Sequence, residues 1–300
     1  MILAYLTDHE LPRTFFEIGP LAVEFYGFFI MLGIIAALIL GLQEGKQIGI
    51  KSNDIIDGLI IILPLAIIGT RLWFVLFQEP AHYFTNPAQI IRIWDGGLAI
   101  HGGILTAIIA TYFFTKRRKM DVWKTLDLVA PGFLIAQAFG RWGNFFNQEA
   151  YGGVIGGLEN GDAALSWAEQ EAFLQETLRL PEFISNQMYI VNGDHGSNFY
   201  HPTFLYESLW NILGLVIVLI LRRTRLIRSG DLIGFYLIWY SLGRFFIEFM
   251  RTDALYIGDT GIRIAQVMSV LLALAGVGVF LLNRYVLKRK PYKDVLNENS

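Results

Sequence analysis

Three arginines, Arg71, Arg141 and Arg244, interrupt apolar stretches of this 300-residue chain, and each follows a glycine by one or two residues. A charged side chain inside a membrane-spanning segment costs about 2.5–3.5 kcal/mol on insertion scales, so such residues usually serve a function. A guanidinium group is planar and can bind a phosphate group through two parallel hydrogen bonds. Brought to one depth, the three arginines would form a site for an anion such as a phospholipid headgroup.

A second polar group surrounds Arg141 in the segment 140–149, which reads GRWGNFFNQE. Asn144 follows Arg141 by three residues, so a continuous helix places both side chains on one face. Asn147 and Glu149 extend the polar set beyond the apolar stretch. Packing of a helix end does not require an arginine, two asparagines and a glutamate. We therefore expect this segment to contact a substrate.

His101 lies among four glycines in the segment 95–103, which reads DGGLAIHGG. Imidazole is the side chain whose ordinary pKa lies nearest to neutrality, which suits a general base. Gly102 and Gly103 would let the backbone approach a ligand and offer it N–H groups. Small residues also allow two helices to pack closely, and a single interfacial histidine is often structural. The neighbouring polar residues favour a direct role for His101.

Further polar side chains occur at the ends of other apolar stretches. Glu248 and Arg251 follow Arg244 by four and seven residues, so all three share one helix face. The remaining candidates are Tyr26, His201, Tyr206 and Glu207. Carboxylates could simply pair with arginines to fasten the helices together. Three arginines and a histidine at one level favour a binding site instead.

Seven apolar stretches of about 20 residues, the length that crosses a hydrocarbon layer, are expected to carry these groups. They cover residues 22–41, 55–77, 97–115, 126–143, 203–221, 231–250 and 264–283. Hydrophobic residues make up 54% of the chain and charged residues 17%, as in proteins embedded in lipid. The sequence therefore predicts an all-α integral membrane protein, with residues 1–300 forming one membrane domain.

The composition also excludes several classes of site. The chain has no cysteine, which rules out disulfides, thiolate metal sites and a cysteine nucleophile. A net charge of −2 gives no overall field that would attract nucleic acid. The sequence shows no cluster of metal ligands, so we expect neither a metal nor a cofactor. Charged residues between Asp8 and Glu17 argue against a cleavable signal peptide.

The distribution of lysine and arginine predicts the orientation. Sixteen of the 24 basic residues follow the first, third, fifth and seventh stretches, five lie on the other side, and three lie inside stretches. The positive-inside rule then places the C-terminus in the cytoplasm and the N-terminus outside. The three buried arginines, His101 and Tyr26 would all lie near the outer leaflet.

The longest connection, residues 145–200, separates the fourth and fifth stretches and would lie outside the membrane. It contains eight acidic residues and a single basic one, Arg179. Connections of this length are usually functional, so we expect a small head region with a helix over about 163–179. A solvated insertion without a function is the alternative.

At these motifs the chain resembles the prolipoprotein diacylglyceryl transferase family. The string Gly-Arg-x-Gly-Asn-Phe-x-Asn-x-Glu at 140–149 is similar to the signature of that family, and three further landmarks occur in the family's order. These are His101-Gly102-Gly103, His201-Pro202-Thr203-x-Leu205-Tyr206-Glu207 and Gly243-Arg244-Phe245-x-x-Glu248-Phe249-x-Arg251. The resemblance covers about residues 20–255 and is weakest in the acidic loop and the tails.

The resemblance implies a multi-pass enzyme of the bacterial cytoplasmic (inner) membrane, with seven spans and the N-terminus outside. Members of the family move a diacylglyceryl group from phosphatidylglycerol to the thiol of the lipobox cysteine in a prolipoprotein, which its signal peptide holds in the bilayer. A thioether forms and glycerol phosphate is released. The nucleophile belongs to the substrate, which agrees with the absence of cysteine from this chain.

The implied reaction suggests a role for each candidate residue. A free thiol has a pKa of about 8.5, so a base must take its proton, and His101 is the candidate. Arg141 and Arg244 would stabilise the charge on the departing phosphate, with Asn144 and Tyr26 as hydrogen-bond donors. Arg71 could bind phosphate or be structural. The other candidates for substrate contact are Gly102, Gly103, Asn147, Glu149, His201, Tyr206, Glu207, Glu248 and Arg251.

Three other functions remain open at this point. A lipid transporter or flippase also holds charges inside a helical bundle, but it usually binds near the midplane and contains inverted repeats. An intramembrane serine protease needs an activated serine, and Ser208, Ser241 and Ser269 lack a Gly-x-Ser-x-Gly setting. A non-enzymatic receptor for signal peptides would share the topology without transferring a group.

Overall fold

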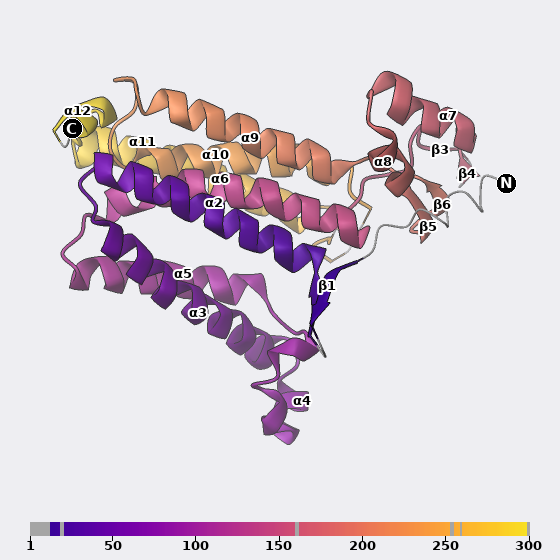
Figure 1. Ribbon diagram of the computed structural model, residues 1–300, viewed down its shortest axis with the longest axis horizontal. Helices are drawn as coiled ribbons and strands as arrows, with labels where there is room; N and C mark the ends of the chain where they lie inside the picture. The colour runs from indigo at the N-terminus through magenta and orange to yellow at the C-terminus, as the bar shows by residue number, and fades with distance from the viewer. Residues whose placement is uncertain (1–12, 19–20, 160–161, 253–254, 259, 299–300) are drawn as a thin grey trace.

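Helices dominate the computed structural model, which describes residues 13–18, 21–159, 162–252, 255–258 and 260–298. Within this part of the chain, seven helices of 18 or more residues lie roughly side by side, as Figure 1 shows. They are α2 (Phe25–Gln47), α3 (Ser52–Phe77), α5 (Ile100–Arg117), α6 (Val122–Asn147), α9 (Thr203–Leu221), α10 (Asp231–Glu248) and α11 (Ile264–Leu281), the last continued by the π-helical turn η5 (Leu282–Val286). A helix covers each apolar stretch of the sequence, with ends that differ by a few residues.

Four of these helices, α2, α3, α9 and α11, have the length and hydropathy needed to cross a membrane. Their large apolar side chains are exposed, for example Ile60 at 64% and Leu271 at 54%, as expected of side chains that face lipid. The chain is therefore a mostly helical membrane protein. The other three helices contain more polar residues, among them Arg141 and Arg244.

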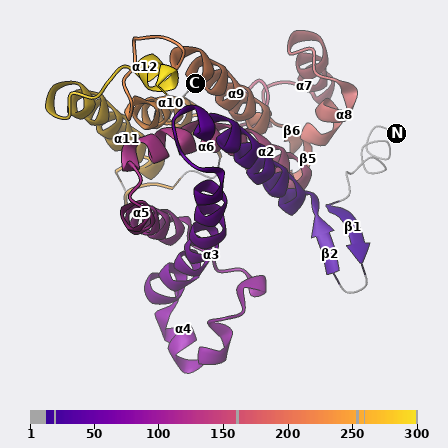
Figure 2. The same cartoon turned by 60° about the vertical axis from the view of Figure 1, so that its left-hand side comes forward.

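The helices associate mainly in pairs. Helix α2 packs along α6, α6 along α9, and α10 along α11. Helices α3 and α5 pack closely on each other but touch the remaining helices less, and Figure 2 shows this pair on one flank of the bundle. The close approach depends on glycines, because a side chain at Gly102 or Gly103 would collide with residues 69–73 of α3.

The short helix α12 (Tyr292–Asn297) lies at one end of the bundle, as Figure 1 shows. Tyr292, Val295 and Leu296 are buried in an apolar core shared with α6, α9 and α10. Arg289 lies 2.5 Å from Asp121, which caps the N-terminus of α6 by accepting hydrogen bonds from the backbone N–H groups of residues 123 and 124. The sequence did not predict α12.

The opposite end carries the head region, whose elements all lie between α6 and α9. These are β3 (Leu158–Glu159), β4 (Asp162–Ala163), α7 (Trp167–Ala172), the π-helical turn η3 (Phe173–Thr177), α8 (Glu182–Ser185), η4 (Asn186–Met188), β5 (Tyr189–Gly193) and β6 (Gly196–Phe199). The helix expected over 163–179 is present as α7 and η3. A core that includes Ile155, Leu174 and Tyr200 holds the region together and continues into Phe145 of α6.

The mostly helical fold also contains a few short strands, which the sequence did not predict. Among the described residues the strands form three antiparallel pairs: β5 with β6 (Tyr189 opposite Phe199), β3 with β4, and β1 (Thr14–Ile18) with β2 (Leu21–Glu24). Between α3 and α5 the chain forms an arm with α4 (Pro80–Thr85), η1 (Pro87–Gln89) and η2 (Ile93–Asp95). The hairpins are too short for a period-two pattern to reveal them.

Candidate active site

Polar side chains of α6, α9 and α10 gather at the head end of the bundle, and we call this group the polar cluster. At its centre is an ion pair between α6 and α9. Nη2 of Arg141 lies 2.5 Å from Oε2 of Glu207, whose side chain is only 8% exposed. Ser208, the next residue, donates a hydrogen bond of 3.1 Å to the carbonyl of Ala138, one turn before Arg141. The two contacts fix the register of α9 against α6. Arg141 and Glu207, which are 66 residues apart in sequence, are therefore held at one level.

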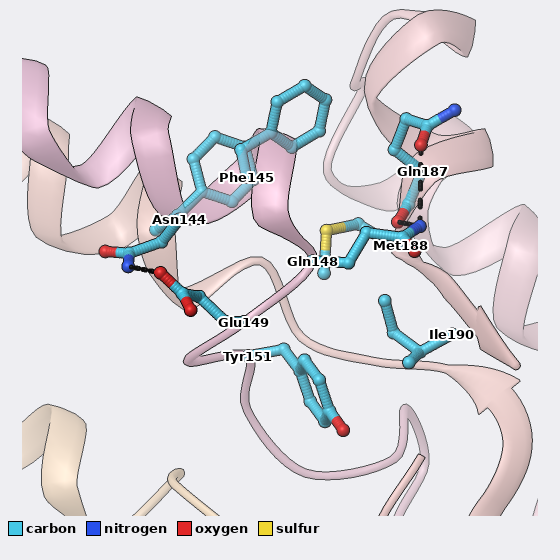
Figure 3. A pocket seen from close by; sticks show the side chains of 9 residues that line it. Asn144, Phe145, Gln148, Glu149, Tyr151, Gln187, Met188 and Ile190 are labelled. Carbon is cyan, nitrogen blue, oxygen red and sulfur yellow. Dashed lines mark hydrogen bonds between the residues drawn. The ribbon is translucent and has the colours of Figure 1, made fainter. Parts of the chain in front are cut away.

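Arg141 continues into the polar residues at the end of α6. Its Nη1 donates to Oδ1 of Asn144 at 3.4 Å, and Nδ2 of Asn144 donates to Oε1 of Glu149 at 2.9 Å. Asn147 donates to the same carboxylate oxygen at 3.4 Å. The four residues singled out in segment 140–149 thus form one continuous network, and Figure 3 shows Asn144 and Glu149 facing each other.

A tight turn directs Glu149 back toward the helix. Gln148 and Ala150, on either side of Glu149, have φ angles of 51° and 56°, a left-handed conformation that is unfavourable for residues other than glycine. Nε2 of Gln148 donates to the carbonyl of Gln187 in the head at 3.1 Å (Figure 3). A cavity of about 10 Å³ lies between Glu149 and these head residues. Backbone strain of this kind is typical of functional sites.

Tyr26 contributes from the first turn of α2. Its ring lies against Gly143 of α6, where an added Cβ would collide with it. Both Glu149 and Arg141 are close enough to interact electrostatically with its hydroxyl group. The rings of Phe25 and Phe146 stack 4.1 Å apart and hold the start of α2 on the end of α6.

Arg244 of α10, like Arg141 of α6, is paired with a buried glutamate. Its Nη2 forms an ion pair of 2.6 Å with Glu248 one turn later, and Glu248 is only 2% exposed. Nη1 of Arg244 is buried and has no hydrogen-bond partner within the described residues. A buried donor without a partner costs about 1–3 kcal/mol unless a ligand accepts from it. The chain contacts the head just after α10 ends, where Arg251 and Gly152 pair as an isolated bridge.

His201 and Tyr206 lie where the head joins α9. Nδ1 of His201 is 3.3 Å from the Tyr206 hydroxyl, and the His201 backbone pairs with Gly152 and Gly153. Burial lowers the pKa of His201 below its ordinary value of 6.5, so the imidazole is neutral at neutral pH. A neutral ring can exchange a hydrogen bond with Tyr206 without adding charge to the cluster.

His101 is an exposed residue in the first turn of α5, at the same end of the bundle. Its ring centre lies 6.4 Å from that of Trp73 on α3. His101 thus belongs to the α3–α5 pair and not to the hydrogen-bonded network around Arg141. Gly102 and Gly103 serve the close packing of that pair, since their missing side chains leave room for Gly69, Thr70 and Trp73.

Arg71 differs from the other two arginines. Its side chain points into the arm and donates hydrogen bonds to backbone carbonyl groups of residues 89–97, and the guanidinium carbon lies 4.8 Å above the Tyr83 ring. The residue is only 4% exposed. Of the two roles expected for Arg71, this geometry favours the structural one.

An apolar cavity of about 400 Å³ lies among α2, α3, α5 and α6. Its lining includes Leu38, Leu59, Phe114 and Phe133, and the few polar residues that touch it are Asp54, Thr111 and Thr125. A space of this size and chemistry suits hydrocarbon chains. No group of three or more metal-binding side chains occurs in the part of the chain that the structure describes.

Several residues that organise the cluster were not singled out from the sequence. Ser208, Gln148 and the stacked Trp210 and Trp239 act through backbone carbonyl groups. Contacts of that kind leave no pattern in a single sequence. The run of polar residues after Arg141 is a usable signal, and Gln148 lies inside it.

Comparison with known proteins gives a consistent result. The sequence model of the family described as prolipoprotein diacylglyceryl transferase matches residues 13–282. A protein named phosphatidylglycerol–prolipoprotein diacylglyceryl transferase from Halalkalibacterium halodurans is 45% identical over 272 residues, which are 91% of this chain and 85% of the relative. A protein of the same name from Bacillus cereus strain G9842 is 45% identical over 275 residues, which are 92% of this chain and 93% of the relative.

Proposed function

The chain belongs to the prolipoprotein diacylglyceryl transferase family, and we propose that the polar cluster at the head end of its helices is the active site. The enzyme transfers the diacylglyceryl group of phosphatidylglycerol to a prolipoprotein. The acceptor is the thiol of the lipobox cysteine. The products are a thioether and glycerol phosphate.

One observation carries the assignment of the site. Arg141 and Arg244 each pair with a buried carboxylate at the same end of the bundle, and Nη1 of Arg244 remains a buried donor without a partner in the described chain. The carboxylates hold the guanidinium groups in place without using all of their N–H donors. Two such groups can bind the phosphate of the lipid and stabilise the charge that grows on it.

The reaction exchanges one bond for another at a glycerol carbon. The thiol loses its proton to a base, its sulfur bonds to the carbon that carries the phosphate ester, and the carbon–oxygen bond breaks. The electron pair leaves with the oxygen of glycerol phosphate. Asn144 and Tyr26 donate hydrogen bonds to the phosphate in this scheme, while Glu149 orients Asn144 and accepts a second hydrogen bond from Asn147.

His101 takes the thiol proton. It is exposed at the head end of α5, where a cysteine at the membrane surface can reach it. His201, Tyr206 and Arg251 contact the substrates from the head side of the cluster. The apolar cavity beneath accepts the acyl chains of the lipid.

The proposal includes a topology. All seven long helices cross the cytoplasmic membrane, with the N-terminus outside and the C-terminus inside. Residues 145–200 form an extracytoplasmic head inserted into the single membrane domain 1–300, and the active site faces the outer leaflet. Support comes from the basic connections, which gather at the end that carries α12, and from the acidic head at the other end.

A reconstituted assay tests this function. Purified protein in vesicles of phosphatidylglycerol is given a synthetic peptide with a signal segment and a lipobox cysteine. We expect one glycerol phosphate to be released for each peptide that gains a diacylglyceryl thioether, and a peptide with serine in place of cysteine to stay unmodified. Lipid translocation without consumption would indicate a flippase, binding without modification a receptor, and cleavage of the peptide a protease.

A further inference from the structure

All five N–H donors of the Arg71 side chain are directed at the arm. Nε donates to the carbonyl of Ile90 at 2.9 Å, and Nη2 donates to those of Gln89 and Arg92 at 2.6 and 3.2 Å. Nη1 donates to the carbonyls of Gly96 and Gly97 at 2.6 and 3.0 Å. Because a guanidinium group has five N–H donors, none remains for a phosphate.

The carbonyl groups that accept hydrogen bonds from Arg71 belong to the segment that directly precedes His101. Gly96 and Gly97 have φ angles of 86° and 72°, which let the arm turn sharply beneath the guanidinium group. Two residues later, the N–H group of Ala99 donates to the carbonyl of Thr70 at 3.1 Å. His101 follows in the first turn of α5. Residues 70 and 71 of α3 therefore hold both the arm and the start of α5.

The other side of His101 is fixed by helix packing. Gly102 lies directly on Gly69 and Trp73, and Gly103 lies on Thr70. The backbone of His101 is thus held before and after the residue, and its ring has Trp73 beside it. Small displacements matter here, since misplacing a catalytic group by about 1 Å can lower a rate about 100-fold.

We propose that Arg71 is a positioning residue of the transfer reaction. It acts through the backbone of residues 89–97 to hold His101 where the substrate thiol can deliver its proton, and it does not bind the phosphate. The inference rests on the proposed function, in which His101 is the base.

Arg71→Lys provides the test, because lysine keeps the charge but cannot gather carbonyls with a planar group of five donors. Transfer is measured with phosphatidylglycerol vesicles and the lipobox peptide. We expect kcat to fall at least about tenfold while KM for phosphatidylglycerol stays within about twofold. In a His101→Gln background the same substitution should cause no further loss, because the group it positions is gone.

Different results would overturn the proposal. A rise in KM with unchanged kcat would make Arg71 a phosphate ligand. An equal loss in both backgrounds would make it a general structural residue. Near-normal turnover of His101→Gln alone would instead remove His101 as the base, so a failure of the underlying function is visible separately.

A second variant covers the case in which Arg71→Lys does not fold. A side chain at Gly97 would collide with Nη1 of Arg71 and with the Phe74 ring, so Gly97→Ala displaces the arm while leaving Arg71 intact. It should give the same loss of kcat, again without further effect in the His101→Gln background. Gly157→Ala is the matched control, because Gly157 has a similar φ of 80° but open space around it in the head. Additive losses for Gly97→Ala and His101→Gln would contradict the proposal.

Discussion

Trp210 of α9 and Trp239 of α10 form a reciprocal contact. The indole N–H of each donates a hydrogen bond of 2.9 Å to the backbone carbonyl of the other, and their rings stack 4.2 Å apart. Trp210 also covers Gly243, the residue before Arg244, and Trp239 covers Gly214. Since Trp210 follows Glu207 by three residues, this contact sets the level of Arg244 relative to the Arg141–Glu207 pair.

Gly243→Ala should therefore impair transfer. The added methyl group would meet the indole of Trp210 and push α9 and α10 apart, which changes the separation of the two arginines that we propose as phosphate ligands. We expect transfer to fall at least about tenfold, equivalent to about 1.4 kcal/mol in the transition state. The control is Gly278→Ala on α11, where an added Cβ meets no atom. Normal transfer by Gly243→Ala would show that the register of these helices does not control the site.

Arg141→Lys should not preserve activity. Lysine keeps the positive charge but cannot bind a carboxylate and a phosphate through a planar fork. Transfer measured with the lipobox peptide should fall at least about tenfold, or about 1.4 kcal/mol. Arg179→Lys, on the exposed surface of the head, should leave it unchanged. Near-normal turnover of Arg141→Lys would mean that Arg141 acts as a point charge or as part of the scaffold.

His101→Gln should lose about 10²–10⁴-fold in transfer rate, the usual contribution of a general base. Glutamine retains a hydrogen-bonding side chain, so phosphatidylglycerol should still bind. The residual rate should rise with pH, because alkaline solution deprotonates the substrate thiol directly. The control is His195→Gln, in the exposed turn between β5 and β6. Weaker lipid binding with an unchanged pH profile would exclude His101 as the base.

Single cysteines can test the topology, because the natural chain has none. We introduce them at Arg117, Lys293 and Glu176, all of which are exposed. A thiol reagent that cannot cross the membrane should label the cysteine at 176 in intact cells. The cysteines at 117 and 293 should react only after the membrane is opened. Labelling of position 117 from outside would reverse the orientation and place the polar cluster at the cytoplasmic surface.

Asp121 should contribute to stability at neutral pH. Burial alone would raise the pKa of this carboxyl group. The hydrogen bond and charge of Arg289, together with the N–H groups at the start of α6, lower the pKa by more than burial raises it, so the net pKa is depressed. A depressed pKa stabilises the fold above the unfolded value of 3.8, and this stability is lost as pH falls through the folded value.

Two substitutions separate the contributions of Asp121. Asp121→Asn keeps the helix cap but loses the partly exposed ion pair, and it should cost about 0.5 kcal/mol at pH 7 and less at pH 3. Asp121→Ala also loses the cap and should cost about 1 kcal/mol more. Thermal unfolding in detergent at both pH values measures the difference. Equal losses at pH 7 and pH 3 for Asp121→Asn would show that the charge of Asp121 does not stabilise the fold.

The sequence predicted most of the helical framework because lipid imposes a simple rule. Among single segments, a long apolar helix crosses a bilayer at a low free-energy cost. Residues 203–221 could therefore be predicted as a helix without knowing which residues they pack against. The Asn144–Glu149 contact could also be expected from the polar run after Arg141. The short elements, such as β5, β6 and α12, are stabilised by tertiary packing, which a local pattern does not record.

Arg71 illustrates why the sequence did not separate the roles of the three arginines. It lies in an apolar helix shortly after a glycine, as do Arg141 and Arg244. Its partners are backbone carbonyls of the arm, whereas those of the other two are side-chain carboxylates. Every residue has a carbonyl group, so a contact with the main chain leaves no trace in residue types.

If the cavity among α2, α3, α5 and α6 holds the acyl chains, as we propose, its lining has a consequence for the choice of lipid. A wall made almost entirely of apolar side chains binds a hydrocarbon chain mainly according to its volume. One methylene group changes the binding free energy by only about 1 kcal/mol. Such a wall has few means to distinguish branched, straight or unsaturated chains of similar volume. A bacterium that remodels its fatty acids as the temperature changes could then keep the same enzyme at work, with lipid selection left to the charged headgroup.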